Sequence, residues 1–194
     1  MWSEKKIIEY LKRNLKDKRF KHSLSVRDTA VKLAEIYGAN VEKAKIAGLV
    51  HDCGKYVKND EMLNIAEKYG YNINEVCLGN SNILHGVVGA YIAKNTMGIE
   101  DNEVLDAVVY HTTARRNMTL LDKIIYIADY IEPLRSFPGV ERVRKVTYEN
   151  LNEGLIMCFD NTIKYVVDKG ELLHNDTIEA RNYMLYSLKW RKDE

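Results

Sequence analysis

The sequence has few residues that interrupt or cross-link a chain. Its 194 residues include two prolines, 11 glycines and three cysteines. No linker, repeat or low-complexity tract divides it, so we expect one domain over residues 1–194, large enough to bury its own core. Cys53, Cys77 and Cys158 are widely spaced and form no CxxC motif, which argues against a disulfide framework or a thiolate zinc site and favours a reducing, cytoplasmic location.

A charge imbalance and a long apolar run are also missing. The 29 lysines and arginines against 28 aspartates and glutamates give a formal net charge of +1, so the composition favours neither nucleic acid nor a membrane surface as a partner. Any anionic ligand must then be held by local charges. The N-terminal segment MWSEKKIIEYLKRN is charged from its fourth residue and is predicted to be neither a signal peptide nor a membrane span. General frequency alone favours a homodimer.

Apolar residues recur at helical spacing along the chain, and no segment has a convincing strand pattern, which predicts an all-α fold. Asp101 is a predicted helix cap, and Thr119 with Asp122 forms a predicted capping box for a helix that Pro133 ends. Gly38 is a natural stop for an earlier helix. The predicted helices span residues 4–15, 18–37, 41–57, 60–70, 83–97, 101–113 and 119–133, with a short turn at 72–77 and C-terminal helices over 139–169 and 177–191.

One apolar stretch ends abruptly in polar and charged residues. Residues 46–55, IAGLVHDCGK, form an apolar run that ends in His51, Asp52, Gly54 and Lys55. An imidazole and a carboxylate at adjacent positions can bind one cation, and the second carboxylate oxygen is free to bridge to another. A divalent ion needs further nitrogen and oxygen ligands, which must come from other parts of the chain.

Histidines and an aspartate interrupt apolar helices elsewhere. His85 lies among isoleucine, leucine and valine, His111 ends a predicted helix, and Asp129 stands in a run of isoleucines, where an unpaired carboxylate is costly. Taken alone, His22 is most simply a surface residue of a lysine-rich helix, and His85 a hydrogen-bonded core residue. Together with the adjacent histidine–aspartate pair, these residues favour a metal centre.

The order histidine, His-Asp, histidine, histidine, aspartate resembles the ligand series of the HD-domain metal-dependent phosphohydrolases over about residues 20–135. Four segments, HDCGK, ILHGVVGAYIA, YHTTARRNMTLLDKIIYIADYIEPLRSFPGV and LLHNDTIEARNYML, look like the YqeK family, the symmetrical diadenosine tetraphosphate hydrolases. This resemblance implies an HD-domain helical bundle with a two-metal centre. It also implies a metal core over about 20–135 and C-terminal helices over 139–191 that complete a nucleotide pocket.

The resemblance further implies a ligand set and a reaction. The residues that match metal ligands of the family are His22, His51, Asp52 and Asp129 for one ion, and His85 and His111, with Asp52 bridging, for the other. Imidazole and carboxylate ligands suit iron, manganese, cobalt or nickel, and family precedent favours iron. The implied reaction splits diadenosine tetraphosphate into two ADP by attack of a hydroxide that bridges the ions, with Asp52 catalytic.

Candidate substrate contacts are of two kinds. Lys55, Arg27 and Arg135 are predicted to hold phosphate oxygens, because guanidinium pairs with phosphate and ammonium supplies a compact charge, and Lys55 is also predicted to be catalytic. The other residues predicted to contact substrate are Ser25, Thr112, His174, Asp176 and Thr177, together with the ligands His85 and His111.

Two positions depart from the residues usual in that family. Cys53 stands where an aromatic is more frequent, and Ala114-Arg115 stands where a glycine is common. Neither position is a ligand, so we expect any effect to fall on pocket shape and substrate preference.

Three other functions compete with this interpretation. The first is an HD-type phosphohydrolase of another nucleotide, either a nucleoside mono- or triphosphate or a cyclic dinucleotide, which would use the same ligands. The second is a nucleotide-binding regulatory module without turnover, against which the intact ligand set argues. A helical nucleic-acid-binding protein ranks last, because the chain has no basic excess.

Overall fold

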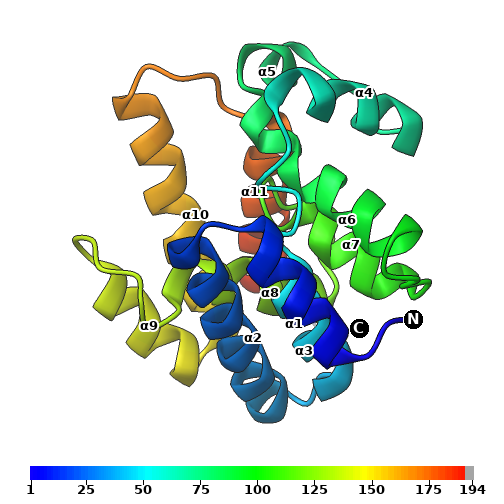
Figure 1. The fold of residues 1–194 in the computed structure, drawn as a ribbon. Helices are drawn as coiled ribbons and strands as arrows, with labels where there is room; N and C mark the ends of the chain where they lie inside the picture. Colours follow the sequence, from blue (N-terminus) through cyan, green and yellow to red (C-terminus); the bar gives the residue numbers. More distant parts are fainter. Residues whose placement is uncertain (191–194) are drawn as a thin grey trace.

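The computed structural model describes residues 1–190, and the regular elements within that range are all helices, as predicted. Figure 1 shows α6 and α7 on one side of the bundle and α9 and α10 on the other. In chain order the elements are α1 Glu4–Asn14, α2 Asp17–Tyr37, α3 Val41–Val50, α4 Asn59–Tyr69, α5 Glu75–Gly79, the 3₁₀ helix η1 Ser81–Leu84, α6 His85–Asn95, α7 Asn102–Tyr110, α8 Leu120–Ile131, α9 Val140–Glu149, α10 Leu151–Asp168 and α11 Asn175–Lys189.

The short helix α3 packs against α2, α7 and α8, and five of its 10 residues, all small or apolar, are buried. The prediction of a helix over 41–57 was too long, because α3 ends at Val50 and residues 51–56 form turns. The Nδ1 atom of His51 donates to the carbonyl of Gly48 at 2.7 Å, and the backbone N–H of Cys53 turns back to Val50 at 2.9 Å. The ring of His51 thus occupies the Gly48 carbonyl, which the backbone N–H of Asp52 would bind if α3 continued.

The predicted helix caps are confirmed. Thr119 and Asp122 exchange side-chain and backbone hydrogen bonds in a capping box that opens α8, and the Asp101 side chain accepts from two backbone N–H groups at the start of α7. Gly38, with φ +72°, ends α2. These local signals place α2, α7 and α8, which carry candidate ligands, at the expected positions.

Other predicted boundaries also change, and the helix predicted over 101–113 ends at Tyr110. The predicted helix 83–97 divides into η1 and α6, with α6 beginning at His85. The C-terminal segment 139–169 holds two helices, because Asn150 interrupts it and its side chain accepts from backbone N–H groups that open α10. The final helix, α11, begins at Asn175, and the predicted end at residue 191 lies outside the described residues.

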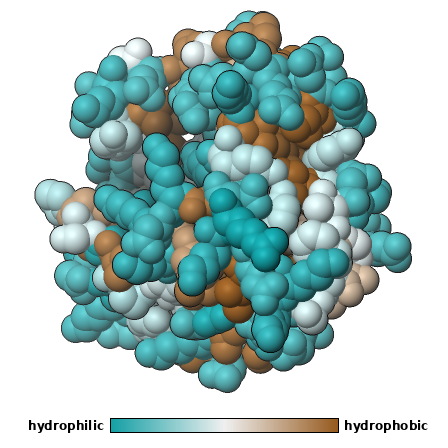
Figure 2. Space-filling model, viewed as in Figure 1, coloured by the Kyte–Doolittle hydropathy of each residue, from teal (hydrophilic) through white to brown (hydrophobic). Residues whose placement is uncertain are grey.

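One hydrophobic cluster extends from α1 to α11. It includes Ile7 of α1, Leu33 of α2, Phe159 of α10 and Met184 of α11. Figure 2 shows hydrophilic residues over most of the visible face, with hydrophobic residues in the gaps between them. Within residues 1–190, no helix combines the length and the apolar character needed to cross a membrane.

Ala114 has a left-handed backbone conformation that glycine adopts more readily. Its φ is +61°, it is fully buried, and its N–H donates to the carbonyl of Tyr110 at 2.8 Å, so it closes the C-terminal end of α7. A Cβ atom in this conformation costs about 1–2 kcal/mol. One of the two departures from the related family therefore falls at a position of backbone strain.

We expect Ala114→Gly to change the free energy of unfolding by less than about 0.5 kcal/mol. Relief of about 1–2 kcal/mol of strain offsets the lost methyl burial, about 0.8 kcal/mol, and the greater freedom of the unfolded chain, about 0.5–1 kcal/mol. The matched control is Ala107→Gly, at a fully buried position inside α7, which should cost about 1–2 kcal/mol because no strain is relieved. Urea unfolding measures both, and equal losses would contradict the strain at Ala114.

Candidate metal centre

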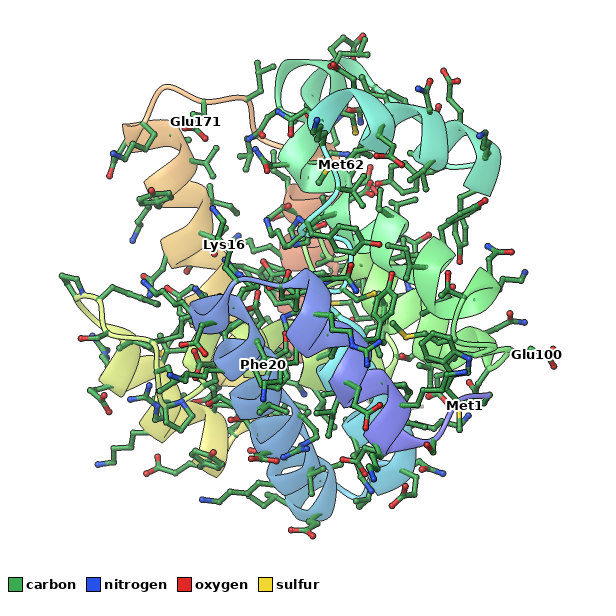
Figure 3. All side chains as sticks on the ribbon, viewed as in Figure 1. Met1, Lys16, Phe20, Met62, Glu100 and Glu171 are labelled. Atoms are coloured by element: carbon green, nitrogen blue, oxygen red, sulfur yellow. The ribbon has the colours of Figure 1, made fainter. Side chains whose placement is uncertain are left out.

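The structure brings together all six residues predicted as metal ligands. They come from α2, the turn after α3, the start of α6, the end of α7, and α8. The first turns of α2, which Lys16 and Phe20 mark in Figure 3, carry the first of these ligands. Five of the six are buried, and the sixth, Asp129, has a side chain that is 25% exposed. The six residues are His22, His51, Asp52, His85, His111 and Asp129.

One group of ligand atoms lies around the Oδ2 atom of Asp52. That oxygen is 3.4 Å from Nε2 of His51 and 3.7 Å from Nε2 of His22. The two imidazole Nε2 atoms are 3.3 Å apart, and Nε2 of His22 is 2.9 Å from Oδ1 of Asp129. The closest ligand atoms of His22, His51 and Asp129 all lie within 4.8 Å of one another.

A second group lies around the other oxygen of the same carboxylate. Oδ1 of Asp52 is 3.1 Å from Nε2 of His85 and 3.8 Å from Nε2 of His111. These two Nε2 atoms are 3.0 Å apart. The Asp52 carboxylate therefore stands between two pairs of histidines and directs one oxygen at each pair.

The opposite ring nitrogen of each histidine is fixed by an acceptor. The Nδ1 atoms of His51 and His111 each donate to the carbonyl three residues earlier at 2.7 Å, and His85 makes the same kind of bond to the carbonyl of Asn82. The Nδ1 atom of His22 faces Oε1 of Glu132 at 2.9 Å. Because these oxygens only accept, each Nδ1 carries the hydrogen, and a neutral ring then presents an unprotonated Nε2.

This arrangement fits a bound cation. Within each pair, two Nε2 lone pairs face each other at 3.0–3.3 Å, a contact that neither ring can satisfy as a donor while both rings are neutral. A cation between them turns this repulsion into coordination, and the carboxylate oxygen beside each pair supplies the negative charge. The outer hydrogen bonds hold the rings as they do in known metal sites.

The ionisation states also suit metal ligands. Burial opposes ionisation of Asp52, but its contacts with His51 and the other imidazoles outweigh burial and hold its pKa well below the usual range. Burial likewise opposes ionisation of Asp129, but the charge of Arg135 lowers its pKa. Burial lowers the pKa of His85 to about 4. At neutral pH these carboxylates are charged and His85 is neutral, the forms that bind a metal ion.

Two residues of the site were missed by the sequence analysis. Nη1 of Arg19 lies 2.6 Å from Oδ2 of Asp52, and the buried Glu132 holds the ring of His22. A spacing signal existed for both, because Arg19 precedes His22 by three residues and Glu132 follows Asp129 by three, which puts each on the same helical face as a ligand. Burial opposes ionisation of Glu132, but hydrogen bonds from Ser25 and His22 lower its pKa.

Two of the three predicted phosphate-binding cations lie at the cluster. Arg135 contacts Oδ1 of Asp129 at 2.5 Å and donates to the Asp129 carbonyl at 2.8 Å. Lys55 is partly buried, and among the described residues it has no ion-pair partner; burial lowers its pKa, against the attraction of Asp52. The structure does not bring Arg27 to the cluster, because its guanidinium pairs with Glu4 of α1 and with Asp28.

A cavity of about 300 Å³ opens beside the second histidine pair. His85, His111 and Thr112 line one side, and Asp129 and Tyr130 line the other. Ile83 of η1 and Thr162 of α10 also line it, and Figure 2 shows the surface hollowed between α10 and α5. Three of the predicted substrate contacts, the two histidines and the threonine, therefore share one space next to the candidate metal ligands.

Four other predicted substrate contacts take part in structural hydrogen bonds outside that cavity. His174 caps α11 and contacts Asn74, and Asp176 lies in the first turn of the same helix. The hydroxyl of Thr177 donates to the carbonyl of Thr113 at 2.9 Å. The Thr177 bond fastens α11 to the segment after α7, and the His174 contact fastens the start of α11 to the residue before α5. The fourth residue, Ser25, supports Glu132, as described above.

Cys53, the other departure from the related family, does not line the cavity. It is fully buried, and its thiol donates to the carbonyl of Gly89 at 3.3 Å. Burial raises the pKa of this thiol. Its side chain thus fills the core between the turn after α3 and α6.

Comparisons with known proteins agree with this geometry. A protein-family model described as HD domain matches residues 19–134. Two curated relatives are named "Bis(5'-nucleosyl)-tetraphosphatase, symmetrical". The one from Halalkalibacterium halodurans is 40% identical over 95% of this chain and 98% of its own length. The one from Staphylococcus aureus is 41% identical over 94% of this chain and 95% of its own length.

A solved structure is similar over nearly the whole chain. It comes from Clostridium acetobutylicum and is described as a predicted HD superfamily hydrolase involved in NAD metabolism. It is 54% identical, with a TM-score of 0.93, and the match covers 99% of this chain and 100% of that chain. The similarity therefore includes the C-terminal helices as well as the histidine cluster.

Replacing Asp52 with alanine removes an oxygen from both groups of ligand atoms. We therefore expect Asp52→Ala to retain neither ion after loading with ferrous iron or manganese, as measured by elemental analysis of metal per chain. Asp60→Ala, which removes an exposed carboxylate on α4, is the matched control and should keep the metal content of the unmodified protein. Two ions per chain in Asp52→Ala would contradict the assignment.

Proposed function

The chain belongs to the HD-domain family and, within it, to the symmetrical bis(5'-nucleosyl)-tetraphosphatases, and from this premise we propose that it hydrolyses diadenosine tetraphosphate to two molecules of ADP. The observation that carries the proposal is the placement of two facing histidine pairs on the two oxygens of Asp52. A chain that is similar to these enzymes over nearly all of its length thus has the donor set for two-metal phosphoanhydride hydrolysis.

We propose two divalent ions, one for each histidine pair. Iron is the first candidate, and manganese, cobalt and nickel are the alternatives, because imidazole and carboxylate ligands suit all four. When bound, such ions lower the pKa of water and neutralise phosphate oxygens. The chain's own part is to hold four imidazoles in one tautomer and two carboxylates in the charged form.

Lys55 is proposed to bind the phosphate chain. Its ammonium is attracted by Asp52 and Asp129 and is partly withdrawn from water. It forms no direct ion pair with a described residue, so it is available to bind an anionic phosphate. A positioned cation in a site of low dielectric stabilises the additional negative charge of the transition state. Lys55 is accordingly proposed as a catalytic residue.

Arg135 and Arg19 are proposed to fix the register of the substrate. Each already holds one ligand carboxylate, Asp129 or Asp52, and a guanidinium has further N–H groups that can donate to phosphate oxygens. Cleavage at the centre of a tetraphosphate requires the chain to be held on both sides of the reacting phosphorus. Two arginines at separate carboxylates meet that requirement.

The reaction is proposed to take place in the cytoplasm. Cys53, Cys77 and Cys158 are all unpaired and buried, as is usual for proteins in a reducing compartment.

Product analysis tests the proposed function directly. The purified protein, loaded with ferrous iron or manganese under reducing conditions, should convert diadenosine tetraphosphate to ADP alone, as separated by ion-exchange chromatography. Formation of ATP and AMP in equal amounts would show that the protein is a hydrolase but would contradict cleavage at the centre of the tetraphosphate. No turnover with either metal would favour another nucleotide substrate or a binding module.

Replacing Lys55 should lower turnover without removing the ions. We expect Lys55→Ala to reduce kcat about 10- to 1000-fold, the range for a lost electrostatic contact to a transition state, with the metal content unchanged. Lys58→Ala removes an exposed lysine three residues later and should leave kcat unaltered. An unchanged rate in Lys55→Ala would exclude this lysine from the mechanism.

A further inference from the structure

A second cavity adjoins the one beside the histidines. It has a volume of about 680 Å³ and lies between α10 and the loop from α8 to α9. Asp129, Tyr130 and Thr162 line both cavities, so the two meet at a metal-ligand candidate. We name the space beside the histidines the inner cavity and this larger space the outer cavity.

The outer cavity carries exposed aromatic rings. The side chain of Tyr165 is 62% exposed and that of Phe137 is 37% exposed. The rings of Phe137 and Tyr130 form a T-shaped pair with centroids 5.0 Å apart, which holds the Phe137 ring in place. Exposed aromatic residues around a hollow are typical of a ligand site, and a nucleobase can stack on them.

Cationic groups also line the outer cavity. Arg135 lies beside Asp129, where the outer cavity meets the inner cavity. Lys164 is exposed on α10 and has no ion-pair partner within residues 1–190. The cavity also contains the carboxylate of Asp168, which is a suitable acceptor for hydroxyl groups of a sugar. The outer cavity thus offers aromatic rings to a base, a carboxylate to a sugar and cationic groups to phosphates.

We propose that the outer cavity binds the second nucleoside of a dinucleoside polyphosphate, while the first nucleoside occupies the inner cavity. This inference rests on the proposed function. A substrate cut at its centre has two identical halves, but a single chain has no internal symmetry and must hold them at two unlike sites. Asp129 lines both cavities, so a polyphosphate that joins them passes a candidate metal ligand between its two ends.

The proposal makes Tyr165 a specificity-determining residue. A ring that stacks on the second base contributes to binding of diadenosine tetraphosphate and contributes nothing to binding of adenosine 5′-tetraphosphate, which has the same phosphate chain and lacks that base. Loss of one stacking contact weakens binding about 5- to 100-fold. Comparing the two compounds therefore distinguishes a role of Tyr165 in the outer cavity, which affects only diadenosine tetraphosphate, from a general defect of the site, which affects both.

The test measures two constants for each variant: KM for diadenosine tetraphosphate, and the inhibition constant of adenosine 5′-tetraphosphate as a competitor, which is defined whether or not that compound is cleaved. For Tyr165→Ala we expect KM to rise about 5- to 100-fold, with kcat and the inhibition constant within about twofold of the unmodified protein, the scatter of a mutation without effect. Tyr165→Phe keeps the ring and should restore KM.

Tyr186→Ala is the matched control, because it removes an equally exposed tyrosine on α11, away from both cavities. An unchanged KM in Tyr165→Ala, or an equal rise in KM and in the inhibition constant, would overturn the assignment of the outer cavity while leaving the proposed function intact. Failure of the unmodified protein to hydrolyse diadenosine tetraphosphate would overturn both.

Discussion

The hydrogen bond from a histidine Nδ1 to a carbonyl at the end of a helix is the interaction on which the rest of the site depends. His51, His85 and His111 each follow a helical segment and donate to the carbonyl three residues earlier. The bond satisfies a carbonyl that the helix leaves free and, at the same time, fixes the ring so that Nε2 points to the centre of the bundle. At His51 and His111, which follow α3 and α7, the negative end of the helix dipole also favours a positive charge nearby.

Charge balance is the second constraint on this structure. Asp52 and Asp129 are held in the core by imidazoles and by the guanidinium groups of Arg19 and Arg135. A buried carboxylate without such partners would be strongly destabilising. The same groups that allow the carboxylates to remain charged in the bundle also keep them ready to bind a cation, so folding and ligand binding place the same demand on these positions.

Much of the fold and of the site could be predicted from the sequence because the deciding signals are local. The capping box at Thr119 and the glycine stop at Gly38 fix helix ends within a few residues, and a polar residue in an apolar helix, such as Asp129, is visible without a structure. The end of α3 at Val50 was not predicted, because the ring of His51 competes for a backbone carbonyl only once the turn has formed. Arg19 lies three residues before His22, on the same helical face, whereas Arg27 lies five residues after it and turns away. The packing of α1 on α2, which presents Glu4 to Arg27, is the part of this difference that the sequence does not show.

The position of the ligands along the chain has a consequence for how the protein unfolds. His22 and its partner Glu132 are 110 residues apart in sequence, and the other ligands come from three more segments between them. An ion bound at this cluster closes several long loops simultaneously and is lost when any one of these helices detaches. Because a ligand that binds only the native state raises stability by mass action, metal availability in the cell would set the lifetime of the folded protein as well as its activity.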